Sequence, residues 1–222
     1  MSSILLISTS GRAASAAIAK DGITIKQALS DSGLTHSETI MPLIDSLFHD
    51  GDIALAGIDA VCADVGPGSF TGVRIGVCIA NAIAYALNKP VIEVSSLEAL
   101  ARAIETSRPV CALIDARNGN GYAALYHNGN ELIPPSPVIV DELLGKLPEN
   151  TVFTGDGAKI HRESILSRMP GAGFADEAVY MLTAGMLAAP ANEKLDSNLT
   201  VKEAQPLYLR PTQAERMYKE HK

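Results

Sequence analysis

One helical segment, residues 71–88, constrains the fold more than any other part of the sequence. Apolar side chains cover almost its whole circumference, and Arg74 is its only charged residue before Lys89. A helix that is apolar on all sides must be buried on all sides. One side can pack on a β-sheet of the same chain, so we expect a second polypeptide to cover the other. The alternative is a central helix covered entirely by its own domain.

The same helix carries a stripe with almost no side chains. Gly72, Gly76 and Ala80 follow one another at steps of four residues. Glycine allows another backbone to approach closely. We interpret the stripe as part of a docking surface for a partner, not as a catalytic centre.

The loop before this helix, Gly66–Gly72, reads GPGSFTG. Glycines before a helix N-terminus can direct N–H groups at an anion, which makes Gly66, Gly68 and Ser69 candidates for nucleotide binding. The loop lacks the lysine of a Walker A motif and the spacing of a dinucleotide fingerprint. It also lacks the second glycine of a hydrolase nucleophile elbow, because Thr71 stands there. The alternative, which we favour, is a tight turn between strand and helix.

Other chemistry finds little support in the sequence. The five histidines have no acid–base pattern around them, and no two lie three to five residues apart. We therefore expect no catalytic triad and no metal site. Asp115 is a conceivable carboxylate ligand, although capping of its turn is the simpler role. Three widely spaced cysteines, Cys62, Cys78 and Cys111, indicate reduced thiols in a cytosolic protein.

Two halves of the chain repeat one plan of strand, turn, strand, hairpin and strand. Asp21 of the first hairpin signal follows Ser8 by 13 residues, and Asn128 of the second follows Asp115 by the same 13. This order indicates an internal duplication. The predicted strands are 4–7, 15–19, 23–30, 60–65 and 91–94 in the first half, and 110–114, 122–126, 131–133 and 151–154 in the second.

Helices are predicted between these strands, so we expect an α/β fold with a mixed sheet in each half. Thr35 and Glu38 form a capping-box pattern at the start of one helix. The prolines of residues 134–137 indicate a loop. The predicted helices are 36–48, 71–88, 95–104, 141–147, 161–168 and 178–188. We divide the chain into an N-terminal lobe, 1–104, and a C-terminal lobe, 105–222, with a charged C-terminal tail.

The net charge of −7 argues against direct binding of nucleic acid, because phosphate contacts need clustered lysines and arginines. If nucleic acid is involved, we expect a partner to supply the basic surface. The chain begins without a basic signal-like segment, and no stretch reaches the roughly 20 uncharged apolar residues of a membrane span. We therefore expect a cytoplasmic protein.

Several motifs together resemble one bacterial family. They are Gly66–Gly76 (GPGSFTGVRIG), residues 94–101 (VSSLEALA) after Pro90, His36–Glu38, residues 114–117 (IDAR), Tyr122–Tyr126 and residues 208–211 (YLRP). In these segments the chain closely resembles the TsaB family, also called YeaZ. The likeness extends over nearly the whole chain and is most specific in the glycine-rich segment.

This resemblance implies an actin-like ATPase (ribonuclease H-like) fold of two duplicated lobes. It also implies a non-catalytic subunit required to form N6-threonylcarbamoyladenosine in tRNA. In that family the chain pairs with a homologous catalytic subunit, TsaD, and with an ATPase, TsaE, and it reaches tRNA only through the complex. A homodimer is expected when the partner is missing. The resemblance assigns this chain no catalytic residue, and it leaves open ADP or ATP at the subunit junction.

The family docks through the helices at 36–48 and 71–88. Carried onto this sequence, the partner-binding residues are Ile40, Leu43, Ile44, Leu47, Gly72, Val73, Arg74, Gly76, Val77, Cys78, Ala80 and Asn81. Positions 74, 78, 81 and 85 are spaced four, three and four apart, which is typical of a seam between paired helices.

The sequence also departs from the family. Ser96 and Leu100 stand where TsaD-type relatives have the metal-binding His-x-x-x-His pair. Ser8 replaces the usual Asp after the first strand, and Asn118–Asn120 replace charged residues. These changes argue against metal binding and ATP hydrolysis in this chain's own cleft, although Asp115 stays a candidate nucleotide contact. The rival hypothesis is a stand-alone, metal-independent hydrolase, either a peptidase or an ATPase.

Overall fold

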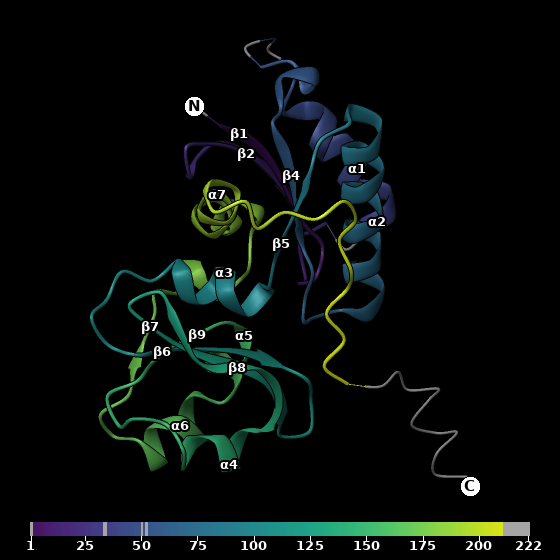
Figure 1. Cartoon of the computed structure of the whole chain (residues 1–222). Helices are drawn as coiled ribbons and strands as arrows, with labels where there is room; N and C mark the ends of the chain where they lie inside the picture. The colour runs from purple at the N-terminus through teal and green to yellow at the C-terminus, as the bar shows by residue number, and fades with distance from the viewer. Residues whose placement is uncertain (1, 33–34, 50, 52, 211–222) are drawn as a thin grey trace, which may run out of the picture.

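The computed structural model of the chain describes residues 2–32, 35–49, 51 and 53–210. It contains two five-stranded sheets, one above the other in Figure 1. The first sheet has the strand order β3-β2-β1-β4-β5. Its strands are β1 (Ser3–Ser8), β2 (Ala14–Lys20), β3 (Ile23–Ser30), β4 (Ala60–Asp64) and β5 (Val91–Val94).

The second sheet repeats this topology with the order β10-β9-β6-β7-β8. In each sheet the first three strands run antiparallel, and the fourth and fifth lie parallel on the other side of the first. The predicted duplication and mixed sheets are therefore confirmed. The strands are β6 (Val110–Asp115), β7 (Asn120–His127), β8 (Asn130–Ile139), β9 (Val152–Thr154) and β10 (Gly173–Phe174).

Helices cover both faces of the first sheet. Helices α1 (His36–Ser46) and α2 (Phe70–Leu87) lie together on one face, where Leu5 and Ile7 of β1 point. Helices α3 (Ser96–Arg102) and α7 (Ala188–Asp196) lie on the other face, where Leu6 points. This alternation is the period of two that places successive side chains of a strand on opposite faces.

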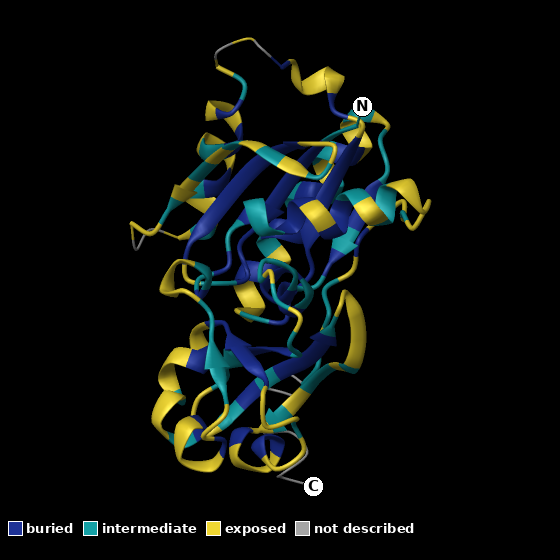
Figure 2. Ribbon diagram, turned by 90° about the vertical axis from the view of Figure 1, so that its left-hand side faces the viewer, coloured by how far each residue is buried: buried dark blue, intermediate teal, exposed yellow. Residues whose placement is uncertain are grey.

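Helix α3 also packs on β6 and β7, so one buried cluster joins the two sheets. The outer face of the second sheet is covered by short helices. They are α4 (Val140–Leu144), α5 (Asp156–Ile160) and α6 (Arg162–Arg168). Figure 2 shows the buried residues concentrated along both sheets. The two halves are thus separate sheets held by a shared core.

Local signals explain where α1 and α2 begin and end. Thr35 and Glu38 form the predicted capping box at the start of α1. The hydroxyl of Ser69 accepts a hydrogen bond from Gly72 N at 3.2 Å and caps α2. Asn88 ends α2 in the left-handed conformation, at φ 52°. Helix α2 therefore begins and ends one residue earlier than predicted.

The predicted loop at residues 134–137 is wrong. Strand β8 continues through the prolines to Ile139, and Pro137 lies opposite Tyr122. Proline cannot donate to a neighbouring strand, but β8 is an edge strand with one unpaired side, where proline is tolerated. Shifts in the register beside Leu125 mark the irregular pairing.

The predicted helix at 178–188 is also wrong. Two 3-10 turns, η2 (Glu177–Val179) and η3 (Ala184–Leu187), occupy this stretch, and the α-helix comes afterwards as α7. The N–H of Ala184 donates to Ser15 Oγ at 2.8 Å, and that of Gly185 donates to Gln27 Oε1 at 2.8 Å. These bonds to the first sheet replace the bonds of a regular helix.

The course of η3 and α7 also corrects the lobe boundaries. Both elements pack on strands of the first sheet, although they follow the second sheet in sequence. The C-terminal lobe therefore does not run without interruption from residue 105, because the chain returns to the N-terminal lobe at residues 184–196. The charged tail at 211–222 lies outside the described residues.

Candidate functional site

The small-residue stripe on α2 packs against its own chain. A Cβ atom added at Gly72 or Gly76 would overlap atoms of Thr9, and one added at Gly68 would overlap the carbonyl of Ser10. Thr9 Oγ1 donates to the carbonyl of Gly72 at 2.7 Å, and Ser69 N donates to Ser10 O at 2.7 Å. The loop between β1 and β2 therefore fills the stripe, which corrects the expectation that a partner does so.

Most of the residues predicted to bind a partner belong to the core. Their side chains point from α1 and α2 toward the first sheet and pack with Leu5 and Ile7 of β1. Because α2 is apolar on all sides, its sequence could not show which side faces the sheet. The buried residues are Ile40, Ile44, Leu47, Gly72, Val73, Gly76, Val77 and Ala80.

Four predicted residues do reach the surface. Arg74 and Cys78 are exposed, whereas Leu43 and Asn81 are partly buried. The prediction omitted Phe70, Tyr85 and Met41 from the site, although the seam spacing of 74, 78, 81 and 85 pointed to Tyr85. Tyr85 is 90% exposed, the highest value among the large hydrophobic side chains of the described residues. We call Phe70, Arg74, Cys78 and Tyr85 the exposed α2 face.

Residues near the described C-terminal end border this face, which the sequence did not reveal. The guanidinium of Arg74 lies 3.9 Å from the ring centroid of Phe70, and Arg74 Nε donates to the Tyr208 hydroxyl at 2.5 Å. The rings of Phe70 and Tyr208 lie 4.9 Å apart. These contacts hold the arginine and both rings in one preformed cluster.

The carboxylate of Asp64 lies fully buried at the end of β4, beside the glycine-rich loop. It accepts hydrogen bonds from Ser8 Oγ at 2.7 Å, Ser96 Oγ at 2.6 Å, Ser10 Oγ, and Gly66 N at 3.0 Å. Burial raises the pKa of Asp64, and these donors partly oppose the rise. Sequence reasoning missed this group, although an acid ending an apolar strand was its signal.

The candidate nucleotide contacts fall into two separate groups. Gly66 and Ser69 donate their N–H groups to Asp64 and Ser10, so these groups are already used within the N-terminal lobe. Asp115 lies at the end of β6 in the second sheet, where it accepts from His161 Nε2 at 3.2 Å.

Asp156 lies beside this second group. Its Oδ1 accepts the N–H of Asp115 at 3.0 Å, and burial raises its pKa. Within the described part of the chain, no group of three or more His, Cys, Asp or Glu side chains is placed to hold a metal ion.

The buried cysteines occupy the core, as expected. Cys62 and Cys111 are fully buried, and burial raises the pKa of Cys111 to about 12. A thiol with so high a pKa stays protonated at neutral pH and is a poor nucleophile. Cys78 is exposed on α2 and is likewise not in a disulfide.

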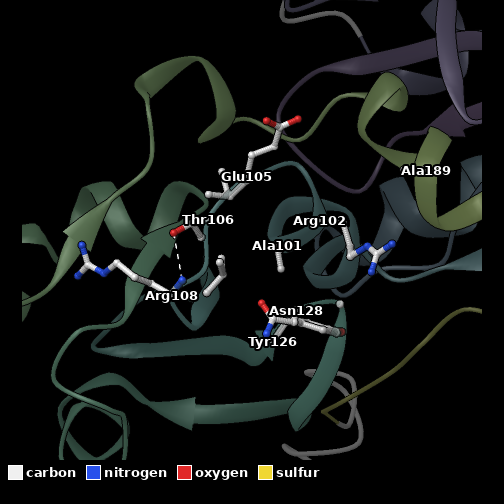
Figure 3. A pocket seen from close by; sticks show the side chains of 11 residues that line it. Ala101, Arg102, Glu105, Thr106, Arg108, Tyr126, Asn128 and Ala189 are labelled. Atoms are coloured by element: carbon white, nitrogen blue, oxygen red, sulfur yellow. Dashed lines mark hydrogen bonds between the residues drawn. The ribbon is translucent and has the colours of Figure 1, made fainter.

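A hollow of about 250 Å³ lies beside the C-terminal end of α3. Arg102 and Arg108 line it but point to opposite sides in Figure 3. Arg102 pairs with Glu193, and Arg108 donates to the carbonyls of Asn150 at 2.6 Å and Gly171 at 2.8 Å. Both arginines that line the hollow therefore already have partners within the chain.

Among the described residues, α2 is the one helix with the length and hydropathy of a membrane span. Its packing gives another reason for this composition. The helix lies along β4 with Val73, Val77, Ala80 and Ala84 buried, and its glycines contact Thr9. The apolar character of α2 thus matches that of a helix packed on a sheet.

Comparison with known proteins identifies relatives over most of the chain. The family model described as "TsaD: tRNA N6-adenosine threonylcarbamoyltransferase" matches residues 30–218. The tRNA threonylcarbamoyladenosine biosynthesis protein TsaB of Bacillus subtilis is 32% identical, over 77% of this chain and 78% of that protein. TsaB of Escherichia coli is 31% identical, over 93% of this chain and 94% of that protein.

Solved structures agree with these sequences. A Pseudomonas aeruginosa protein described as similar to peptidase YeaZ has a TM-score of 0.80 at 26% identity, covering 95% of this chain and 100% of the other. YeaZ from the same organism has a TM-score of 0.75 at 27% identity, covering 94% and 100%.

A more distant structure shows the fold alone. The activator of 2-hydroxyisocaproyl-CoA dehydratase from Clostridium difficile, solved with ADPNP, has a TM-score of 0.52 at 11% identity, covering 88% of this chain and 97% of the other. The expected actin-like ATPase fold is thereby confirmed. Sequence and fold lead to the same conclusion, that the chain belongs to the TsaB (YeaZ) family of tRNA threonylcarbamoyladenosine biosynthesis proteins.

Proposed function

We propose that the chain is a non-catalytic subunit that supports N6-threonylcarbamoyladenosine formation in tRNA by docking on a catalytic homologue. Membership of the TsaB family supports the pathway. The exposed α2 face supports the docking, and Tyr85 is the single observation that carries it. Tyr85 is 90% exposed and offers a partner a large ring with a polar hydroxyl, on the same face of α2 as Phe70 and Arg74.

The composition of this face is that of a binding hot spot. Tyrosine and arginine are enriched among residues that dominate binding energy, and both lie on α2. Arg74 is held in place by Phe70 and Tyr208 before any partner arrives, which lowers the entropy lost on binding. The face is therefore suited to docking, although eight of the twelve residues predicted to bind a partner are buried.

The partner that fits this proposal is a TsaD-like catalytic homologue. The TsaD family model itself matches residues 30–218, so the two chains would share a fold and could pair through like helices. A TsaE-like ATPase would complete the assembly, and a homodimer would cover the same face when the partner is missing. The net charge of −7 favours contact with tRNA through the complex and not by this chain alone. We place this complex in the cytoplasm.

The absence of catalysis in this chain is part of the proposal. Ser96 and Leu100 are buried in the core where TsaD-type relatives would place metal-binding histidines. The carboxylate of Asp64 is already surrounded by donors from this chain. We propose no cofactor in this cleft, and we place any ADP or ATP at the junction with the partner.

The test is the charge-introducing variant Tyr85→Asp. We expect it to weaken binding to the TsaD-like homologue at least about tenfold, because a carboxylate would have to be desolvated at the interface. Leu132→Asp on β8, where the side chain is 53% exposed, is the matched control. Titration calorimetry measures the affinity, and circular dichroism shows that both variants are folded.

Equal affinity of Tyr85→Asp and wild type would contradict the proposal. Variants at Gly76 or Val77 are unsuitable because both residues are buried and their loss would disturb the fold. The rival hypothesis of a stand-alone hydrolase predicts peptide or ATP turnover by the purified chain. Turnover that persists in Tyr85→Asp and exceeds that of a heat-denatured control would favour the rival.

A further inference from the structure

The segment 201–210, which we call the C-terminal strap, runs from one lobe to the other. It follows α7 and crosses in front of β5 and α2 before it descends toward the second sheet (Figure 1). Val201 forms an antiparallel bridge with Val91 at the edge of β5, with N–O distances of 2.9 and 2.8 Å. The strap therefore begins as an addition to the first sheet.

Specific bonds then fix the strap along α2. Asn81 Nδ2 donates to the carbonyl of Ala204 at 3.0 Å, and Ala204 N donates back to Asn81 Oδ1 at 2.8 Å. Ala204 is buried. This pair of bonds imitates the pairing between neighbouring strands and sets the register of the strap on the helix.

The middle of the strap closes over the glycine-rich loop. Leu207 N donates to the carbonyl of Val65 at 2.8 Å, directly before Gly66. Tyr208 then packs on Phe70 and accepts from Arg74 at the start of α2. Both ends of the loop are thus held by the strap.

The last described residue of the strap reaches the other lobe. Arg210 Nη2 donates to Asn120 Oδ1 at 3.1 Å, and its guanidinium lies 5.6 Å from the ring centroid of Tyr122. Asn120 and Tyr122 belong to β7 in the second sheet. One short segment therefore contacts β5, α2 and the glycine-rich loop of one lobe and β7 of the other.

The position of the strap relates these contacts to the angle between the two lobes. The lobes are also joined through α3, which lies on the opposite face of the first sheet from α2. A single connection would let the lobes turn about it, whereas two separate connections fix their angle. We propose that the C-terminal strap is a latch that holds the two lobes at a fixed angle and keeps the glycine-rich loop closed. Arg210 is the residue that closes the latch.

Hydrogen exchange on the full chain tests the latch, because a variant made in one lobe can be read in the other. We expect Asn120→Ala to raise amide exchange about tenfold in the first-lobe loop 66–70, and Arg210→Ala to give at least the same rise because it also removes the contact to Tyr122. The double variant should exchange no faster than Arg210→Ala alone, because that substitution already removes the hydrogen bond to Asn120 together with the contact to Tyr122. Lys202→Ala, at an exposed strap residue, is the matched control and should leave the exchange unchanged.

The outcomes separate clearly. Faster exchange confined to residues 117–121 in Asn120→Ala would overturn the proposal, because the effect would then be local to the second lobe. Unchanged exchange in Arg210→Ala, or additive effects in the double variant, would overturn it as well. None of these readings needs a partner, so the latch can fail while the proposed docking function stands.

Discussion

The two halves of the molecule share a strand order but differ in the helix that follows the fourth strand. In the first half this helix is α2, with 18 residues, and in the second it is α5, with five. Each helix has a glycine near its N-terminus that lies against another backbone segment of its lobe. Gly72 of α2 lies beside Thr9, directly after β1, and Gly157 of α5 lies beside Leu113 of β6. Both lobes thus keep the close approach, whereas only the first has a long helix at this position.

The loops after the first strand of each half differ in the same sense. Thr9 and Ser10 are buried beneath α2. Arg117, Asn118 and Gly119 are exposed and adopt positive φ angles of 67°, 54° and 73°. The first loop packs against α2, and the second is an open turn. Equivalent positions in a duplicated fold therefore need not keep equivalent roles.

Among substitutions that test this difference between the lobes, we expect Gly72→Val to have the largest effect. A side chain there would meet the backbone carbonyl of Thr9, which cannot move without shifting β1. We expect a loss of about 3 kcal/mol or more in the free energy of unfolding. Gly145→Ala in the second half, where an added Cβ makes only ordinary contact, should change it little. Urea denaturation measures both, and equal stabilities would show that α2 can lift off its loop.

A smaller effect is expected from Asp64→Asn. The amide brings donors to a place where three hydroxyls and an N–H already donate, so we expect about 1–2 kcal/mol of destabilisation. Asp115→Asn, in the partly exposed counterpart loop, should cost less. Urea denaturation at neutral pH compares the two variants, and a larger loss at Asp115 would reverse the assignment of the structural carboxylate.

The pH dependence of the same variant sharpens the test. The folded chain holds the proton of Asp64 more tightly than the unfolded chain, because burial raises its pKa. As pH rises above about 4, wild type therefore loses stability that Asp64→Asn does not lose. The stability gap between them should narrow with rising pH. A gap that widens would mean that the four donors outweigh burial.

The smallest expected effect is that of Arg117→Gly. Arg117 has a φ of 67°, a conformation that costs a non-glycine residue about 1–2 kcal/mol. Glycine removes this strain but loses more conformational entropy on folding. We expect a net gain of about 0.5 kcal/mol in thermal unfolding experiments. A loss would show that the Arg117 side chain makes a stabilising contact that outweighs the strain.

Much of the fold could be predicted from local signals. The strands 23–30 and 91–94 have their predicted bounds, and the hairpin signals at Asp21 and Asn128 lie where the strands turn. These features depend on hydrophobic runs and turn residues that are local in sequence. The same signals placed the start of α2 at the glycine-rich loop to within one residue.

The site was harder to predict because it depends on distant parts of the chain. The sequence around Gly76 does not show that Thr9 packs against this side of α2. The sequence around Ala204 does not show that its backbone bonds to the side chain of Asn81. The prolines of β8 were misjudged because an edge strand is recognised only from its neighbours. The seam spacing did indicate Tyr85, since a helical period needs no tertiary information.

The return of the chain to the first lobe has a consequence for how the protein is made. Leu6 and Ile92, on one face of the first sheet, are covered by Leu187 and Ala191, which are among the later residues to leave the ribosome. The second lobe lies between these two parts and is synthesised whole before the first lobe can close. Part of an apolar face of the first sheet therefore stays uncovered while the second lobe is translated.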